Sequence, residues 1–297
     1  YTNLYAMTDK IKYAIIGAGC MGQEHILNIE IIEDAKVVAL CDTSEQSIKE
    51  SLELLNNEVA IFEDYNELVR ANIADAFIIA TPNFTHIDVL KDVMKSEAHL
   101  LIEKPLCTTV KDCQEFEELS KNYPGVIWIA MEYRYMPPVQ RMIQEIHNKT
   151  IGDLKMLSIR EHRFPFLHKV DDWNRFTIKT GGTLVEKCCH FFDLMRLIAK
   201  SEPLKVYASG NQDVNHLDET YDGMTPDILD NAFVIVDFEN GVRAFLDLCM
   251  FAENSEYQEE LCAVGSIGKI ETAVPSNDSG ISISDVRIGL RESEKAK

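Results

Sequence analysis

The 297-residue sequence lacks long apolar runs and is poor in positive charge. No stretch approaches the roughly 18 consecutive apolar residues that a membrane-spanning helix needs. Lys and Arg number 29 against 49 Asp and Glu, which gives a formal net charge of −20. Such a charge repels phosphate backbones and anionic lipid surfaces. We therefore expect neither nucleic acid nor a membrane as a partner.

Cysteine pairs with CxxC spacing are also missing. None of the eight cysteines has another cysteine three positions away, and several, such as Cys41 and Cys249, lie within apolar runs. This spacing predicts reduced, mostly buried thiols. The first ten residues lack the basic and then apolar order of a secretion signal. We expect a cytoplasmic protein.

The composition and periodicity are those of a globular protein with two domains. Hydrophobic residues make up 46% of the chain, and its length suits about two domains. In 1–131, short runs that are apolar throughout alternate with segments of helical spacing, which indicates an α/β fold with a doubly wound parallel sheet. The segment 132–297 has the pattern of an α+β domain with a mainly antiparallel, open sheet.

The same patterns place individual elements. In the first domain they predict strands at Ile11–Ile16, Val37–Cys41, Ala76–Ala80, Leu100–Ile102 and Val126–Ala130, and helices at Thr85–Ser96 and Thr109–Lys121. In the second domain they predict helices at Val139–Asn148 and Gly182–Lys200, and loops at Phe164–Thr180 and Asn211–Asp230. Strands are predicted there at Lys155–Arg163, Leu204–Gly210, Ala232–Phe238, Val242–Met250, Tyr257–Val264 and Ile281–Ile288, with a hairpin turn at Asn240-Gly241.

A glycine-rich loop directly follows the first strand and opens a helix: Gly17-Ala18-Gly19-Cys20-Met21-Gly22. Gly17 permits the tight turn, and Gly22 lets the helix pack closely on the strand. A side chain at Gly19 would block the approach of a pyrophosphate. The start of the helix, at Cys20 and Met21, offers N–H groups and partial positive charge to phosphates. The loop therefore predicts a dinucleotide site.

Asp42 ends the next strand, twenty residues after Gly22. An acid at this place accepts hydrogen bonds from the adenosine ribose, and its charge repels a 2′-phosphate. We therefore expect NAD rather than NADP. The alternative is a glycine-rich turn into an ordinary helix, with Asp42 as a helix cap.

Further polar residues follow strand ends, where parallel sheets bind ligands. These are Thr81-Pro82-Asn83 and Glu103-Lys104-Pro105, and we expect the cofactor to contact Thr81, Pro82, Asn83, His86, Glu103 and Lys104. In the predicted helix at 182–200, Glu186 and His190 are four residues apart and so share one face.

These motifs occur in the order found in the Gfo/Idh/MocA oxidoreductases, and the sequence resembles that family over nearly its whole length. The resemblance rests on the glycine loop, the triplet at 103–105, Tyr133-Arg134-Tyr135-Met136-Pro137, the Gly-Gly-x-Leu…His…Asp segment at 181–193, and Gly265-Ser266-Ile267-Gly268. It implies a Rossmann domain that binds NAD(P), hydride transfer at a hydroxyl or carbonyl of a sugar, cyclitol or related polyol, and a homodimer or homotetramer. Relatives usually continue past this length, so we expect the C-terminus to be incomplete.

The resemblance also assigns catalytic roles. Lys104 matches the lysine that contacts substrate and assists proton transfer, and His190 matches the usual catalytic histidine. Glu186, the third catalytic candidate, stands where many members have aspartate, and its extra methylene displaces the carboxylate. The chemistry agrees, because an imidazole suits the removal of a hydroxyl proton near neutral pH. Lys104 would then stabilise the developing alkoxide.

Substrate contacts are expected from Lys104, Tyr133, Arg163, Trp173, Glu186, His190 and Asp193. An aromatic face with polar neighbours commonly holds a sugar-like ring, although a solvated strand face and a buried tryptophan would give the same pattern. Glu186 with His190, or Cys189 with Asp193, offers pairs of metal-ligand type. No second ligand cluster at zinc spacing accompanies them, so we expect no metal.

Two other functions are compatible with these residues. One is an NAD-dependent glycosidase or epimerase that oxidises its substrate transiently and releases no net NADH. The other is a non-enzymatic, nucleotide-sensing regulatory protein that has kept the dinucleotide fold. The presence of both Lys104 and His190 favours an enzyme.

Overall fold

The computed structural model describes residues 10–274 and 286–291 of the chain. They form two compact units, divided between Ala130 and Met131, one residue from the predicted boundary. Within these described ranges, no helix is long and apolar enough to cross a membrane.

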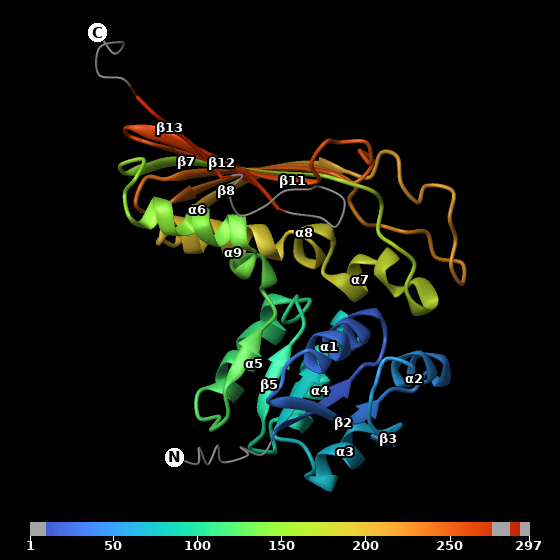
Figure 1. Ribbon diagram of the computed structural model, residues 1–297. Coiled ribbons are helices and arrows are strands. Elements are labelled where there is room, and N and C mark those ends of the chain that lie inside the picture. Colours follow the sequence, from blue (N-terminus) through green and yellow to red (C-terminus); the bar gives the residue numbers. More distant parts are fainter. Residues whose placement is uncertain (1–9, 275–285, 292–297) are drawn as a thin grey trace, which may run out of the picture. The chain divides into compact units, whose positions relative to one another are not determined.

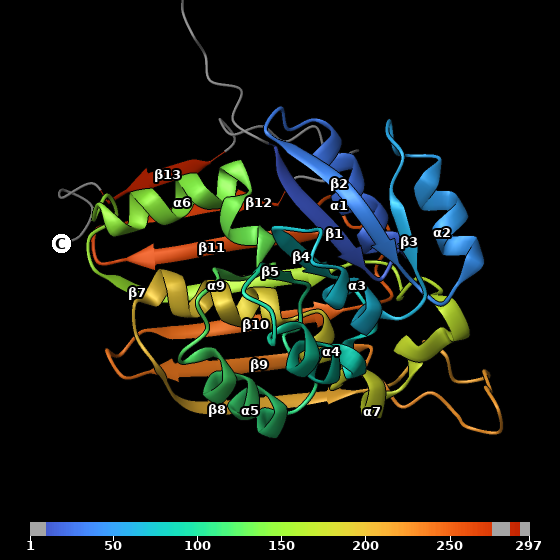
Figure 2. The same cartoon turned by 90° about the horizontal axis from the view of Figure 1, so that it is seen from below.

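The first unit is built on a six-stranded sheet with the order β3-β2-β1-β4-β5-β6, in which all neighbours are parallel (Figures 1 and 2). Its strands are β1 (Ile11–Ile16), β2 (Ala35–Cys41), β3 (Ala60–Phe62), β4 (Ala76–Ile79), β5 (His99–Ile102) and β6 (Ile127–Ile129). Its helices are α1 (Cys20–Glu30), α2 (Glu45–Leu52), α3 (Tyr65–Ala71), the short 3₁₀ helix η1 (Asn83–Thr85), α4 (His86–Val93) and α5 (Val110–Ser120). The order confirms the predicted doubly wound sheet.

The side chains of β1 are buried on both faces of the sheet. Ala14 and Ile16 pack in one hydrophobic cluster, whereas Ile15, between them, packs in another. Successive side chains of a strand point to opposite faces, so each face of the sheet has its own core. This is why the strands have continuous apolar runs instead of an alternating pattern.

The predictions missed two elements of this unit, β3 and α3. β3 has only three residues at the edge of the sheet, and its side chains are exposed or half-buried, so its apolar run is too short to stand out. α3 begins after Asp64, whose carboxylate accepts the N–H of Asn66 at 2.8 Å. That capping residue is the signal that could have revealed the helix.

A seven-stranded mixed sheet forms the second unit, in the order β13-β12-β11-β7-β10-β9-β8 (Figure 2). The strands are β7 (Leu154–His162), β8 (Pro203–Asn211), β9 (Asn231–Phe238), β10 (Arg243–Cys249), β11 (Glu259–Gly265), β12 (Gly268–Ala273) and β13 (Arg287–Leu290). Only β7 and β10 run parallel among these pairs, which confirms a mainly antiparallel sheet. Asn240-Gly241 turns β9 into β10 as predicted, with Gly241 at φ 84°.

Helices lie on one face of this sheet (Figure 1). They are the 3₁₀ helix η2 (Glu132–Tyr135), α6 (Pro137–His147), the 3₁₀ helix η3 (Val170–Arg175), α7 (Thr177–Thr180), α8 (Thr183–Glu186) and α9 (Cys189–Ala199). In β9, Val234 and Val236 are buried while Phe233 and Ile235 are exposed, so one side of the strand faces the core and the other does not. The hydrophobic core of the unit lies on the helix-covered face.

The prediction of one continuous helix at 182–200 is wrong. The N–H groups of Lys187 and Cys188 both reach the carbonyl of Thr183, at 3.0 and 3.4 Å, which makes a wide turn between α8 and α9. Glu186 and His190 therefore belong to different helices. The residue in this turn, Lys187, forms ion pairs with Glu161 and Glu259, which are distant in the sequence, so local spacing could not reveal its surroundings.

Two further expectations need correction, and a third lies mostly outside the described residues. The predicted loop at 164–180 contains η3 and α7. All eight cysteines are free thiols, but only Cys41, Cys107 and Cys188 are buried. Cys249 and Cys262 occupy strand positions that alternate with core positions, and so their apolar neighbours gave a misleading signal. Of the strand predicted at 281–288, residues 281–285 lie outside the described residues, and β13 begins at Arg287.

Candidate active site

The glycine loop has the geometry that a pyrophosphate site needs. A Cβ atom at Gly17, which has φ +97°, would lie 2.5 Å from the carbonyl carbon of Ala80, and one at Gly22 would lie 2.1 Å from the carbonyl oxygen of Gly17. Both glycines are therefore required by packing. At Gly19, in contrast, nothing lies within 4 Å of the Cβ position. The open space at Gly19, at the N-terminus of α1, is where phosphates can approach backbone N–H groups.

No acidic side chain lies in the first turn of α1, which begins with Cys20 and Met21, so nothing there opposes an anion. The Cys20 thiol is exposed. These residues fit the pyrophosphate of a dinucleotide through backbone groups, and the acidic net charge of the chain does not prevent such binding.

Asp42 is held by the backbone on both sides of its carboxylate. Its Oδ2 accepts the N–H of Ala18 at 2.7 Å, and its Oδ1 accepts the N–H of Ser44 at 2.8 Å. The first bond ties the end of β2 to the glycine loop, and the second supports the turn into α2. Each carboxylate oxygen has a second lone pair, so the side chain can still accept a ribose hydroxyl.

The loops after β4 and β5 are linked by His86. Its Nε2 lies 2.9 Å from the carbonyl oxygen of Thr81, and its Nδ1 lies 3.0 Å from that of Pro105. The side chain is fully buried. The ring thus lies between the Thr81-Pro82-Asn83 segment and the triplet that contains Lys104, and the contact of His86 with the cofactor stays a prediction.

Glu103 and Lys104 follow β5 at the carboxyl edge of the sheet. Glu103 is buried, and its Oε1 lies 2.8 Å from His25 Nε2 on α1. Burial by itself raises the pKa of the Glu103 carboxyl, but the hydrogen bond and charge of His25, helped by Lys104, lower it below its usual value. The Lys104 backbone N–H donates to Glu103 Oε2 at 3.1 Å, which fixes the chain where the lysine side chain emerges.

In the second unit, His190 lies near the start of α9 and is buried. Its ring stacks on the ring of Tyr133, with centroids 4.5 Å apart and planes 9° apart. Its Nε2 lies 4.0 Å from Glu132 Oε1. The imidazole therefore has a fixed plane, and the Glu132 carboxylate lies near its Nε2 edge.

Glu186 ends α8 and is also buried. Its Oε1 lies 3.7 Å from Lys169 Nζ, and the same ammonium lies 4.8 Å from the ring centre of Trp173. Glu186, Lys169 and Trp173 thus form one group. An aromatic ring and a carboxylate in one group suit a polyhydroxylated ring.

Asp193 forms an ion pair with Arg134 through two hydrogen bonds, one of them 2.5 Å from Arg134 Nε to Asp193 Oδ2. Both oxygens are engaged by the guanidinium, and the pair joins α9 to η2, the helix that carries Tyr133. The predicted contact of Asp193 with substrate stays a prediction.

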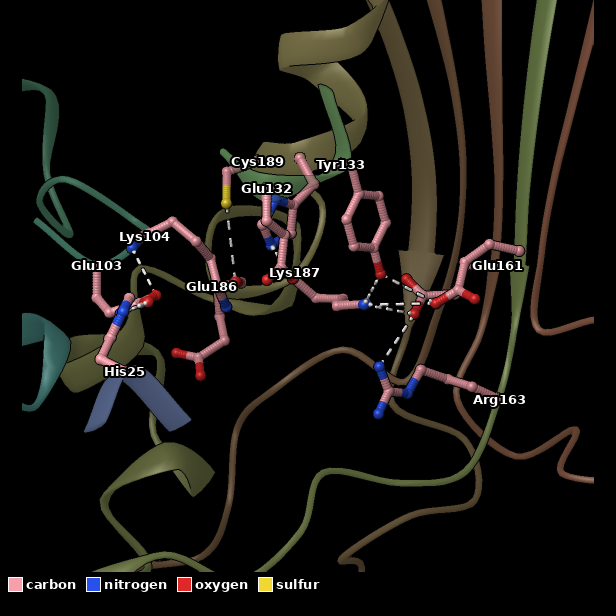
Figure 3. A network of polar contacts seen from close by, with 12 residues as sticks. His25, Glu103, Lys104, Glu132, Tyr133, Glu161, Arg163, Glu186, Lys187 and Cys189 are labelled. Carbon is pink, nitrogen blue, oxygen red and sulfur yellow. Dashed lines mark hydrogen bonds and ion pairs between the residues drawn. The ribbon is translucent and has the colours of Figure 1, made fainter. Parts of the chain in front are cut away.

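Sequence reasoning missed a buried group of charges next to Tyr133. Lys187 Nζ lies 3.0 Å from Glu161 Oε1 and 3.6 Å from Glu259 Oε1 (Figure 3). Arg163, a predicted substrate contact, lies 3.2 Å from Glu161 through Nη1. The alternation of buried and less buried residues along β7 and β11 could have revealed this group, because it places Glu161 and Glu259 on the same faces as core residues.

Metal ligation was weighed for Glu186, Cys189, His190 and Asp193. In the part of the chain that the structure describes, no group of three or more His, Cys, Asp or Glu residues is arranged to hold a metal ion.

Comparisons with known proteins match both units. The model of an oxidoreductase family with an NAD-binding Rossmann fold, Gfo/Idh/MocA, matches residues 11–131, and the model of that family's C-terminal α/β domain matches residues 143–295. An uncharacterised oxidoreductase, YrbE, of Bacillus subtilis is 28% identical over 81% of this chain and 67% of its own length. A myo-inositol 2-dehydrogenase of Thermotoga maritima is 27% identical over 88% of this chain and 74% of its own length.

A solved structure of a probable dehydrogenase from Thermotoga maritima superposes with a TM-score of 0.77 at 25% identity, over 95% of this chain and 81% of that one. Sequence and fold thus agree across both units. The chain belongs to the Gfo/Idh/MocA family of NAD-binding oxidoreductases.

Proposed function

We propose that this protein is an NAD-dependent dehydrogenase that oxidises a secondary hydroxyl of a cyclitol, sugar or related polyol. The observation that carries the proposal is the fixed, buried imidazole of His190 in a chain that also has an intact glycine loop. The similarity to a myo-inositol 2-dehydrogenase supports this substrate class.

Oxidation of such an alcohol removes a hydride from carbon and a proton from oxygen. Bound NAD supplies the hydride acceptor. We assign the proton to His190, because an imidazole accepts a proton near neutral pH. Lys104, as an ammonium, stabilises the negative charge that develops on the oxygen. Glu186 and Trp173 support the hydroxyls and the face of the ring.

The preference for NAD over NADP is supported by Asp42. Its carboxylate is held in place by the N–H groups of Ala18 and Ser44, so it cannot easily turn away from a 2′-phosphate. The repulsion between these two anions disfavours NADP.

We also propose that the protein is a homodimer or homotetramer that associates through the outer face of the seven-stranded sheet. Phe233, Ile235 and Tyr207 lie on this face and are 57%, 42% and 49% exposed. The rings of Phe233 and Phe245 stack there with centroids 5.7 Å apart. Exposed apolar groups of this kind favour association with a second copy.

The activity is tested with inositols, aldoses and anhydrosugars, each with NAD and with NADP, by following the absorbance of the reduced cofactor. We expect reduction of NAD by at least one polyol. His190→Ala and Lys104→Ala should each lower kcat by about 100-fold or more while calorimetry still finds NAD bound. Full activity in either variant would refute the role given to that residue.

The same substrate panel tests the two alternative functions. Turnover of a glycoside or epimer without net NADH would replace the proposal with a transient-oxidation mechanism, and NAD binding without any turnover would favour a regulatory protein.

A further inference from the structure

Two carboxylates face each other on adjacent strands inside the second unit. Glu161 of β7 pairs directly with Glu259 of β11 in the antiparallel register, and both side chains are buried. Like charges opposite each other in a sheet are destabilising, and burial increases the cost. Burial is also the first cause that raises the pKa of the Glu259 carboxyl, although Lys187 opposes it. Such a pair needs a specific compensation.

Lys187 and Arg163 provide that compensation. The Lys187 ammonium lies 3.0 Å from Glu161 Oε1 and 3.6 Å from Glu259 Oε1, and Arg163 lies 3.2 Å from Glu161 (Figure 3). We call Glu161, Arg163, Lys187 and Glu259 the buried charge cluster. It contains two cations and two carboxylates. A cluster of this kind contributes little net stability, but it can fix one arrangement of the groups around it.

Tyr133 connects the buried charge cluster to His190. Its hydroxyl accepts a hydrogen bond from Lys187 Nζ at 2.8 Å and donates one to Glu259 Oε1 at 3.1 Å. The hydroxyl thus both accepts and donates a hydrogen bond within the cluster, so the far end of the ring is held in place there. The imidazole of His190 stacks on the face of this ring, with centroids 4.5 Å apart.

Lys187 also acts through the backbone. It lies in the wide turn between α8 and α9, where the Cys188 N–H reaches back five residues to the carbonyl of Thr183. The turn sets the offset between Glu186 and His190. Because the Lys187 side chain is held by the buried charge cluster, the turn is held with it.

We propose that Lys187 and Tyr133 are positioning residues for His190: the buried charge cluster fixes Lys187, Lys187 orients the ring of Tyr133, and that ring sets the plane of the imidazole. The proposal rests on the proposed function only in taking His190 as the proton acceptor. It predicts that Lys187, which is adjacent in sequence to a catalytic candidate, acts without touching substrate.

The test measures the imidazole itself as well as turnover. In the full chain, the Cε1–H NMR resonance of His190, assigned by its loss in His190→Gln, should be displaced by the ring current of Tyr133. Four variants separate the steps: Lys187→Met removes the charge, Lys187→Arg keeps it, Tyr133→Phe removes only the hydroxyl, and Tyr133→Leu removes the ring. Val236→Ala, a core truncation on β9, controls for a general loss of stability.

We expect Tyr133→Leu to abolish the ring-current displacement and Lys187→Met to change it, while Val236→Ala leaves it unaltered. Lys187→Met and Tyr133→Phe should each lower kcat by about tenfold to 100-fold with little change in KM, since a misplaced catalytic group costs about that much. Lys187→Arg should restore most of the loss. Lys187 acts on His190 through Tyr133, so the kcat of the double variant Lys187→Met/Tyr133→Phe should be no lower than that of either single variant.

The proposal is overturned if the resonance and kcat are unchanged in Lys187→Met, or if the two single losses multiply in the double variant. Should Lys187→Met fail to fold, Tyr133→Phe decides the question by the same two measurements. If the wild-type protein oxidises no polyol, the proposed function fails, and the NMR comparison still decides whether Lys187 and Tyr133 set the environment of His190.

Discussion

His25 and Glu103 are joined at 2.8 Å between Nε2 and Oε1, and they connect α1 to the first residue after β5. α1 is the helix that opens at the glycine loop, and Glu103 directly precedes Lys104. The pair therefore couples the predicted phosphate site to the predicted catalytic lysine. It also gives the first unit a dependence on pH.

We predict that the pairing of His25 with Glu103 stabilises the first unit fully above the ordinary pKa of glutamate and progressively less in acid. The pKa of Glu103 is lowered in the folded protein, so its contribution is present above about pH 4.3 and is lost as the pH falls through the lowered value. His25→Gln should unfold more easily than wild type at about pH 6, by about 1 kcal/mol. Denaturant unfolding at a series of pH values measures this difference, which should shrink in acid. A difference that stays constant with pH, or that persists in a Glu103→Gln background, would contradict the assignment.

Substitution of two glycines of the loop should affect NAD binding in one case and stability in the other. Gly19→Ala places a methyl group in open space with an ordinary φ of −74°, so unfolding should change by less than about 0.5 kcal/mol. The same methyl group should weaken NAD binding by about tenfold or more, because it occupies the approach of the pyrophosphate. Gly22→Ala is the matched control: its Cβ would lie 2.1 Å from Gly17 O, and we expect about 1–3 kcal/mol of destabilisation. Calorimetry with NAD and thermal unfolding distinguish the two variants, and tight NAD binding by Gly19→Ala would argue against the site.

We expect the ion pair of Arg134 with Asp193 to contribute to stability and not to substrate binding. Asp193→Asn and Arg134→Gln each break the same pair, so we expect similar losses of a few degrees in Tm and a coupling of about 1 kcal/mol in a double-variant cycle. The estimate is modest because the Arg134 side chain is 38% exposed and solvent screens the pair. A rise in KM confined to Asp193→Asn would show instead that the carboxylate contacts substrate.

Association through the seven-stranded sheet can be tested at Phe233. Phe233→Asp places a charge among Ile235, Tyr207 and Phe245, and we expect it to shift the protein to monomer in sedimentation experiments while α9 and its imidazole are undisturbed. Ile178→Asp, an exposed apolar residue of α7 outside this sheet, is the matched control. An unchanged oligomer in Phe233→Asp would exclude this face as the interface.

Much of the fold could be predicted because its signals are local. The apolar run at Ile11–Ile16 is β1 in the structure, and Asn240-Gly241 forms the predicted hairpin turn. The predictions that failed concern elements with weak local signals or with partners that are distant in the sequence. β3 and β12 were missed, and the helix predicted at 182–200 is interrupted at Lys187, whose partners Glu161 and Glu259 are remote in the sequence.

The candidate site shows the same limit. Sequence motifs located Gly19, Lys104 and His190, since the spacing of each motif reflects local backbone requirements. They could not show that His86 bridges two backbone carbonyls or that Tyr133 stacks on His190. Those contacts depend on which side chains the tertiary structure brings together.

The two backbone hydrogen bonds of Asp42 constrain how cofactor preference can change. Replacing this acid with a small neutral residue would remove the repulsion of a 2′-phosphate, but it would also free the N–H of Ala18 and loosen the loop that receives the pyrophosphate. Adaptation to NADP, in evolution or in the laboratory, therefore requires a second substitution that restores an acceptor for Ala18. Under the proposed preference for NAD, Asp42 links discrimination between the two nucleotides to the shape of the glycine loop, because one side chain would serve both.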